Sequence, residues 1–481
     1  MRIAPLCALL VAVLSFAPAR LRADALDDAF GGLPLPPQPT QLRLMTDNHE
    51  AWYARWHAIS GAKKTIDCTY FTVTSDFVGE SMIALLMQKA REGVQIRMLI
   101  DSRGSLGLID NPFTDDYLPA LARFPNVQIR RYNAWHAALA VLPTNLKAGI
   151  ASNHSKIIIV DGETVVAGGR NLSDHWFTSV ADDKLSFHDV DFVARGASIG
   201  AQARRAFEDE YDALKSLPVK PATDKQFATA STFLDRVRRN TENLMNGLLV
   251  PGPGTPELNL FRSLNQYASY VEFQSGDLVP MSLLGKHSAS NPMRNPVTDS
   301  LLSLINAAQT ELTIAHAYMV LTDGVKKALR AASDRGVKIR FITNSPESTE
   351  SVLTQAFFVK EWKTYLRDVP NLRIIALAEG RKLHGKVIVV DRRVTILGSY
   401  NMDPMSENIN AEDAAVVKSE SFAAESIAWM DDMLKEGIEY KIKIEADGTL
   451  TQVVGPSDHC KKRTLMILKM ISWFGWLRPL V

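Results

Sequence analysis

The chain has 481 residues, of which 46% are hydrophobic and 22% charged, and its formal net charge is +1 at neutral pH. This length is about three times that of a typical domain, so we expect two domains with appendages. The composition is that of a globular protein, and the near-zero net charge argues against nucleic acid as a partner unless a local basic groove exists.

The N-terminus predicts export. Met1 and Arg2 precede an apolar run from Ile3 to Pro18, and small residues follow as far as Ala23. This layout is typical of a secretory signal, which we expect at residues 1–23. The run is shorter than a membrane-spanning helix requires, and an uncleaved anchor is the alternative. We therefore expect a periplasmic protein that is peripheral on a membrane.

Two cysteines follow the signal, Cys68 in an apolar strand pattern and Cys460 in a polar tail. An exported protein could join them in a disulfide, but two free thiols are the simpler expectation. Neither cysteine has the histidine or cysteine spacing of a metal site.

One pattern of elements occurs twice. A strand at 65–71, a helix at 80–91 and a strand at 93–101 form the first copy. The second copy has a strand that begins at 311–314, a helix at 324–332 and a strand at 336–342. Strand, helix and strand in this order are typical of a parallel or mixed sheet covered by helices.

The repeat predicts an α/β fold with two tandem α/β sandwich domains related by pseudo-two-fold symmetry. We place the domains at 40–215 and 281–440, a connector at 216–280 and a tail at 441–481. Within the connector, residues 224–249 have a helical pattern, which the Pro-Gly repeat at 251–254 breaks.

Each copy is followed by a half-motif of identical spacing, His-x-Lys, then Asp, then Gly-x-x-Asn. The members are His154, Lys156, Asp161, Gly168 and Asn171 in the first half, and His384, Lys386, Asp391, Gly398 and Asn401 in the second. A lone His-x-Lys occurs by chance in many chains, whereas equal spacing at four polar positions in both copies is not a coincidence.

The half-motifs carry the groups that phosphodiester transfer needs. Histidine and lysine at i and i+2 of a strand project from one face, so two such strands meeting across a dyad would gather both pairs at the domain interface. The reaction requires a nucleophile, an acid for the leaving oxygen, and positive and N–H groups for the phosphoryl oxygens. Lysine supplies charge without a metal and asparagine a directed N–H, so we expect no cofactor and no metal.

These motifs resemble those of the phospholipase D superfamily, and the resemblance covers nearly all of the mature chain. The second half carries the fuller signature, since Asp403, Ser406 and Glu412 follow Asn401. In that family one histidine attacks phosphorus to form a phosphohistidine, the other protonates the leaving alcohol, and acidic residues orient both imidazoles.

The resemblance implies that His154 is the nucleophile and His384 the general acid, although the reverse order is open. Glu412 and Asp189 would orient the imidazoles, and Asp191 is the alternative to Asp189. The phosphoryl oxygens would be held by Lys156, Lys386, Asn171 and Asn401.

The first half departs from the family pattern, because it has Gly169 where the second half has Ser399, a supporting residue. Asp161 and Asp391 each precede a turn-like pair, and we expect them to be scaffold residues rather than catalysts.

The C-terminal tail bears on the substrate. Lys461, Lys462 and Arg463 precede an apolar stretch with Trp473 and Trp476, a composition that suits a membrane interface. A helix docked on its own domain is the alternative.

Segment 334–345 and the hydrophobic C-terminus resemble bacterial cardiolipin synthases, the C-type especially. This resemblance implies phospholipid substrates and transfer of a phosphatidyl group to phosphatidylglycerol. A secreted phospholipase D, a periplasmic nuclease and a membrane-associated binding protein without turnover are the alternatives, and the sequence makes no prediction of the oligomeric state.

Overall fold

The computed structural model describes residues 24–105, 116–133, 145–213, 215–249, 261, 264–291, 294–377, 380 and 382–481. The predicted signal at 1–23 and the Pro-Gly break at 251–254 lie outside the described residues. No helix in the described ranges is both long and apolar enough to cross a bilayer.

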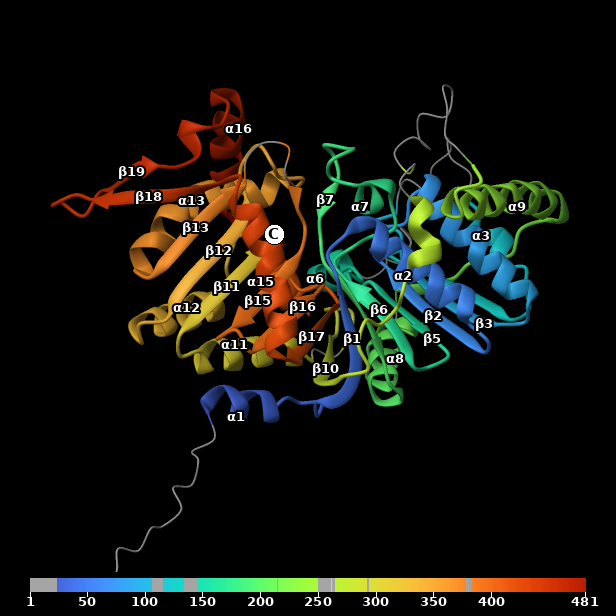
Figure 1. Cartoon of the computed structure of the whole chain (residues 1–481). Coiled ribbons are helices and arrows are strands. Elements are labelled where there is room, and N and C mark those ends of the chain that lie inside the picture. The colour runs from blue at the N-terminus through green and yellow to red at the C-terminus, as the bar shows by residue number, and fades with distance from the viewer. Residues whose placement is uncertain are drawn as a thin grey trace, which may run out of the picture.

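A mixed sheet forms the first half, with the strand order β9-β4-β3-β2-β5-β6-β8-β1 (Figure 1). Strands β2, β3 and β4 are parallel, and β5 runs antiparallel to β2. The strands are β1 (Gln38–Met45), β2 (Thr65–Tyr70), β3 (Gln95–Asp101), β4 (Val127–Tyr132), β5 (Ile157–Val160), β6 (Thr164–Gly168), β8 (Asp191–Arg195) and β9 (Ser216–Pro218).

The second half repeats this order as β10-β17-β16-β15-β11-β12-β13-β18, and β19 is added at the far edge. Its strands are β10 (Leu278–Lys286), β11 (Glu311–His316), β12 (Lys338–Asn344), β13 (Leu372–Leu377), β15 (Lys386–Val390), β16 (Val394–Gly398), β17 (Glu412–Lys418), β18 (Gly437–Ile444) and β19 (Leu450–Val454). Because β1 pairs antiparallel with β10, the two halves form one continuous sheet, as expected for two copies related by a two-fold axis. The predicted fold class is confirmed.

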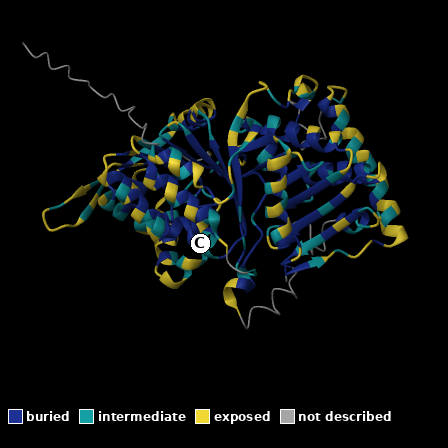
Figure 2. Ribbon diagram, turned by 90° about the horizontal axis from the view of Figure 1, so that it is seen from below, coloured by how far each residue is buried: buried dark blue, intermediate teal, exposed yellow. Residues whose placement is uncertain are grey.

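Helices cover both faces of this sheet. The outer face of the first half packs against α2 (Asn48–Gly61), α3 (Phe77–Arg91), α4 (Leu118–Leu121) and α9 (Asp224–Met245). The outer face of the second half packs against α1 (Ala25–Gly31), α11 (Pro296–Ala307), α12 (Asp323–Asp334) and α13 (Val352–Asp368). Figure 2 shows mostly buried strands between helices whose outward faces are exposed.

The inner faces of both halves share a third core around α8 (Ala197–Tyr211) and α15 (Glu420–Leu434). Helix α8 contacts β10 of the other half, and α15 contacts β1. A Cβ at Gly285 of β10 would lie 2.7 Å from the Cβ of Ala206 on α8, so glycine permits this close contact. The two halves are therefore joined by a common hydrophobic core as well as by the sheet.

Shorter elements complete the fold. They are α6 (Leu146–Ile150), α7 (Asp174–Phe177), β7 (Phe187–His188), a 3₁₀ turn at Leu264–Ser269, β14 (Lys382–Leu383), α14 (Pro404–Asn408), α16 (Lys462–Ser472) and 3₁₀ turns at Pro456–Asp458 and Gly475–Leu480. Strands β7 and β14 pair in parallel and link the two halves.

Local chemistry sets the element ends. The helix expected at 80–91 begins at Phe77, because the Asp76 side chain accepts a hydrogen bond from the Gly79 N–H. The strand expected from 93 begins at Gln95, because Gly93 has a positive φ of 88° and forms the turn. The region 216–280 contributes β9 and α9, which pack on the first half. Cys68 and Cys460 are buried thiols rather than disulfide partners.

Candidate active site

Both His-x-Lys segments lie where the two halves meet. The His154 N–H donates to the carbonyl of Ala411 at 2.9 Å, directly before Glu412. The His384 N–H donates to the carbonyl of His188 at 2.8 Å, directly before Asp189. Each histidine segment is thus held by the backbone of the other half, next to an acidic residue of that half.

The acidic residues pair with the histidines across the interface. His154 Nδ1 lies 2.9 Å from Glu412 Oε2, and His384 Nδ1 lies 2.6 Å from Asp189 Oδ2. Both carboxylates are buried. A carboxylate accepts hydrogen bonds only, so it places the imidazole proton on Nδ1 and directs Nε2 toward the substrate side.

The two acidic positions are structurally equivalent although one is Asp and the other Glu. Asp189 stands two residues before the partner of Gly168 in the sheet, and Glu412 stands two residues before the partner of Gly398. The pseudo-two-fold axis therefore relates the two histidine–carboxylate pairs.

The Gly169–Ser399 difference follows from these carboxylates. A Cβ at Gly169 would lie 2.1 Å from Asp189 Oδ1, so the first half needs glycine there. Ser399 Oγ donates to Glu412 Oε2 at 2.6 Å, and Ser406 Oγ donates to Oε1 at 2.7 Å. Burial raises the pKa of Glu412, but the His154, Lys156 and Ser399 contacts outweigh it and lower the pKa below its ordinary value.

Asp191, the alternative orienting residue, faces away from His384. Its carboxylate pairs with Arg55 at 2.9 Å and with Arg170 at 3.2 Å, and all three side chains are buried. Arg170 in turn donates to the Asp189 carbonyl at 2.6 Å. Asp191 thus supports the backbone that carries Asp189.

Both lysines are buried beside the histidines. Lys156 Nζ donates to the His154 carbonyl at 2.5 Å, and Lys386 Nζ donates to the His384 carbonyl. Burial lowers the pKa of Lys156 to about 7 and also lowers the pKa of Lys386. Burial lowers the pKa of His154 to about 4, with the two lysine charges acting in the same direction and Glu412 against them. The negative charge of a bound phosphate would offset the repulsion between the ammonium groups of Lys156 and Lys386.

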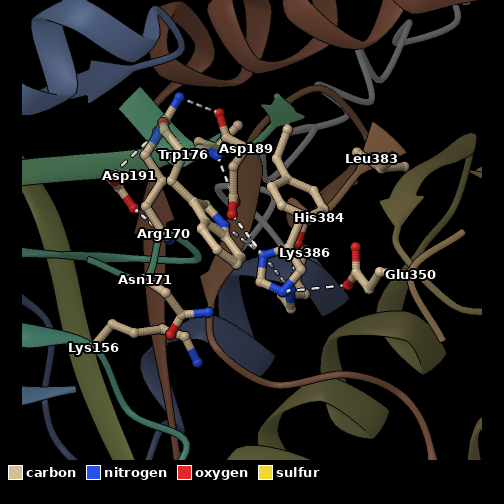
Figure 3. Close-up of polar contacts among 12 residues, drawn as sticks. Lys156, Arg170, Asn171, Trp176, Asp189, Asp191, Glu350, Leu383, His384 and Lys386 are labelled. Atoms are coloured by element: carbon tan, nitrogen blue, oxygen red, sulfur yellow. Dashed lines mark hydrogen bonds and ion pairs between the residues drawn. The ribbon is translucent and has the colours of Figure 1, made fainter. Parts of the chain in front are cut away.

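The asparagines border the same space. Asn171 Oδ1 accepts the Thr72 N–H at 3.2 Å, so the amide oxygen is fixed and the NH₂ group is directed away from Thr72. Asn401 is buried, and its Oδ1 has no partner among the described residues. Its backbone N–H donates to Ser406 Oγ at 3.2 Å, and the Asp403 carboxylate holds the Ser406 N–H at 2.8 Å. Figure 3 shows Lys156 and Asn171 beside His384 and Lys386.

Comparison with known proteins identifies the family. Residues 56–207 and 301–434 match the family described as "Cardiolipin synthase, PLD-like domain". The chain belongs to this family. It is therefore a phospholipase D-type phosphodiesterase or phosphatidyltransferase.

The chain is 26% identical to cardiolipin synthase C of Escherichia coli (strain K12) over 402 residues, covering 78% of this chain and 80% of that protein. It is also 26% identical to cardiolipin synthase A of Pseudomonas aeruginosa (strain PAO1) over 403 residues, covering 83% and 68%. Its fold is similar to the crystal structure of phosphatidylserine synthase from Haemophilus influenzae, with a TM-score of 0.62, 13% identity, and coverage of 94% and 98%. The phospholipase D-like fold is thus shared along nearly the whole chain.

Asp161 and Asp391 lie in turns away from the histidines of this phospholipase D-like site. Asp161 accepts the backbone N–H groups of Lys63, Lys64 and Thr65, and Asp391 accepts those of the equivalent turn at 309–311. Both residues have a positive φ, 52° and 49°. Their geometry is that of turn residues.

Three further side chains lie near His384 and belong to no sequence motif. Trp176 Nε1 lies 3.4 Å from His384 Nδ1, with its ring edge-on to the imidazole. Glu350 Oε1 lies 3.8 Å from His384 Nε2, and the Tyr318 hydroxyl donates to the same oxygen at 2.5 Å. Trp176 lies on α7, whereas Tyr318 and Glu350 lie in the loops before α12 and α13. None of the three belongs to the repeated half-motif, so spacing alone could not indicate them.

Proposed function

We propose that the protein transfers a phosphatidyl group from one phospholipid to a hydroxyl of phosphatidylglycerol and so makes cardiolipin. The observation that carries the proposal is the pair of crossed histidine–carboxylate contacts, which gathers two imidazoles and two ammonium groups at one interface. The cardiolipin synthases among its relatives support the lipid substrate.

In the first step the Nε2 lone pair of His154 attacks phosphorus. The bond from phosphorus to the leaving alcohol breaks, and the His384 Nε2 proton passes to the leaving oxygen. Lys156, Lys386 and the two asparagine amides hold the phosphoryl oxygens as negative charge develops.

In the second step the acceptor hydroxyl gives its proton to His384 Nε2 while its oxygen attacks phosphorus. The phosphorus–nitrogen bond breaks, and His154 recovers its lone pair. One phosphodiester replaces another, so the exchange is nearly isoenergetic and needs no nucleotide.

The order of the histidines is supported by their surroundings. The low pKa of His154, about 4, keeps it neutral near pH 7, which a nucleophile requires. Carboxylates of Asp189 and Glu350 lie beside the two ring nitrogens of His384, at 2.6 Å from Nδ1 and 3.8 Å from Nε2, an arrangement suited to a ring that passes a proton to and from the alcohol oxygen.

We also propose that the C-terminal tail contacts a membrane on the periplasmic side, the location that the N-terminal pattern favours. Helix α16 packs on α13 through buried Leu465 and Leu468. Its other face and the turn after it expose apolar side chains, and Trp473 is 81% exposed. Residues 459–481 contain no acidic residue, so the tail complements anionic lipid headgroups.

The direct test incubates purified protein with phosphatidylglycerol vesicles, with and without phosphatidylethanolamine, and measures cardiolipin and phosphatidic acid by mass. We expect cardiolipin as the main product, no effect of metal chelators, and loss of product in His154→Ala and in His384→Ala. Phosphatidic acid as the main product would instead indicate a hydrolase. Loss of added DNA without lipid change would indicate a nuclease.

A further inference from the structure

Glu350 stands on the reacting side of His384. It lies in the loop between β12 and α13, and its side chain is 28% exposed. Its Oε1 accepts the Tyr318 hydroxyl at 2.5 Å. The same oxygen lies 3.8 Å from His384 Nε2 (Figure 3). Asp189 occupies the opposite nitrogen, Nδ1, so Nε2 is the atom that faces the alcohol oxygen.

The geometry leaves Glu350 able to accept one more hydrogen bond. Within the described part of the chain, its contacts to Tyr318 and His384 both use Oε1. Oε2 is therefore available, on a carboxylate that Tyr318 holds in place. An atom bonded to this oxygen would lie next to the alcohol that His384 protonates or deprotonates.

The charge of Glu350 determines which kind of hydrogen-bond donor can bind at Oε2. A carboxylate repels the anionic phosphodiester, so Glu350 suits the alcohol side of the reaction. Burial lowers the pKa of Lys386, and the charges of Asp189 and Glu350 counter this effect, so Glu350 is near enough to Lys386 for their charges to attract. A neutral hydroxyl can approach Glu350 without repulsion from Lys386, whereas a second cation cannot.

We propose that Glu350, positioned by Tyr318, binds the acceptor and thereby favours transfer over hydrolysis, a role that rests on the proposed function. In a polyol headgroup one hydroxyl gives its proton to His384 Nε2 and attacks phosphorus, while the phosphorus–His154 bond breaks. The neighbouring hydroxyl donates to Glu350 Oε2 and orients the attacking oxygen. Water has no neighbouring hydroxyl group, so an attacking water is not oriented by a second hydrogen bond to Glu350.

The test compares two soluble acceptors of equal carbon length, deuterium-labelled glycerol and 1-propanol, with unlabelled phosphatidylglycerol vesicles as donor, so that the mass of the label distinguishes the phosphatidylglycerol formed from the donor. For each acceptor, the phosphatidyl alcohol formed is divided by the phosphatidic acid formed in the same tube, so the ratio does not depend on the folded fraction. We expect Glu350→Ala to lower the glycerol ratio by about tenfold or more, as loss of a charged hydrogen bond implies, and to leave the propanol ratio within about twofold. Tyr318→Phe should lower the glycerol ratio less.

The matched control is Asp323→Asn, a change to an exposed carboxylate at the start of α12. It should keep both ratios. An equal fall with both acceptors, an unchanged glycerol ratio, or loss of all product in Glu350→Ala would overturn the acceptor role. A wild-type protein without any lipid turnover would count against the proposed function itself.

Discussion

Replacement of Asp189 by asparagine should stop His384 from exchanging protons. Asp189 Oδ1 accepts the Val190 N–H at 2.8 Å, and Oδ2 accepts His384 Nδ1 at 2.6 Å. In Asp189→Asn the amide oxygen must stay on the Val190 N–H, so the NH₂ group faces His384 Nδ1. That nitrogen must then accept, which places the imidazole proton on Nε2 and leaves no lone pair there for the acceptor hydroxyl.

The size of the effect follows from the loss of the working tautomer. A wrong tautomer of a catalytic histidine costs on the order of 10³ to 10⁴ in kcat, or about 4 to 5 kcal/mol of transition-state stabilisation. Gly169→Ala should act in the same direction, because its Cβ would lie 2.1 Å from Asp189 Oδ1 and displace the carboxylate.

The assay measures kcat for cardiolipin formation per folded molecule. Thermal unfolding measures how much of each variant is folded and how stable it is. The neighbouring Asp191→Asn is the control: it leaves Arg55 and Arg170 buried without their carboxylate, so we expect about 3 kcal/mol or more of lost stability and kcat within tenfold of wild type. If Asp189→Asn kept more than a tenth of wild-type kcat, the orienting role would be refuted.

Three further predictions concern pH, the turns and the tail. Because His154 must be neutral and Lys156 charged, kcat/KM for phosphatidylglycerol should fall as pH drops through about 4 and as it rises through about 7, and a flat profile over this range would contradict the assignment. Asp161→Ala and Asp391→Ala each free three backbone N–H groups and should cost about 2 kcal/mol in chemical denaturation without changing kcat per folded molecule. Trp473→Ser should weaken sedimentation with anionic vesicles several-fold, and unchanged binding would exclude this tail as the contact.

Much of the fold could be predicted because the repeat is local. Equal spacing around His154 and His384 indicated two copies of one α/β unit, and the polar pattern indicated the chemistry. The crossed pairing could not be predicted, because it depends on how β1 and β10 dock the two halves. The periodicity of a sequence gives no information on a long-range contact such as the pairing of β1 with β10.

The choice between Asp189 and Asp191 shows the same limit. The two residues are two positions apart in the sequence, so the pattern does not say which of them reaches His384. The contacts of Asp191 with Arg55 and Arg170 distinguish them in the structure. Neither Glu350 nor Tyr318 belongs to the half-motifs. The contact of Tyr318 with Glu350, and of Glu350 with His384, is a product of tertiary packing. In contrast, the turn-like pairs after Asp161 and Asp391 indicated turns from local sequence, although the backbone groups that these carboxylates accept lie on distant segments.

The central claim is a phosphohistidine at His154, formed at the interface of the two halves. Rapid quenching of the enzyme during turnover of phosphatidylglycerol, at alkaline pH to preserve the phosphorus–nitrogen bond, followed by peptide mass analysis tests it directly. We predict a phosphatidyl adduct on the peptide that contains His154 and none in His154→Ala. An adduct on the His384 peptide, or turnover in His154→Ala, would contradict the account.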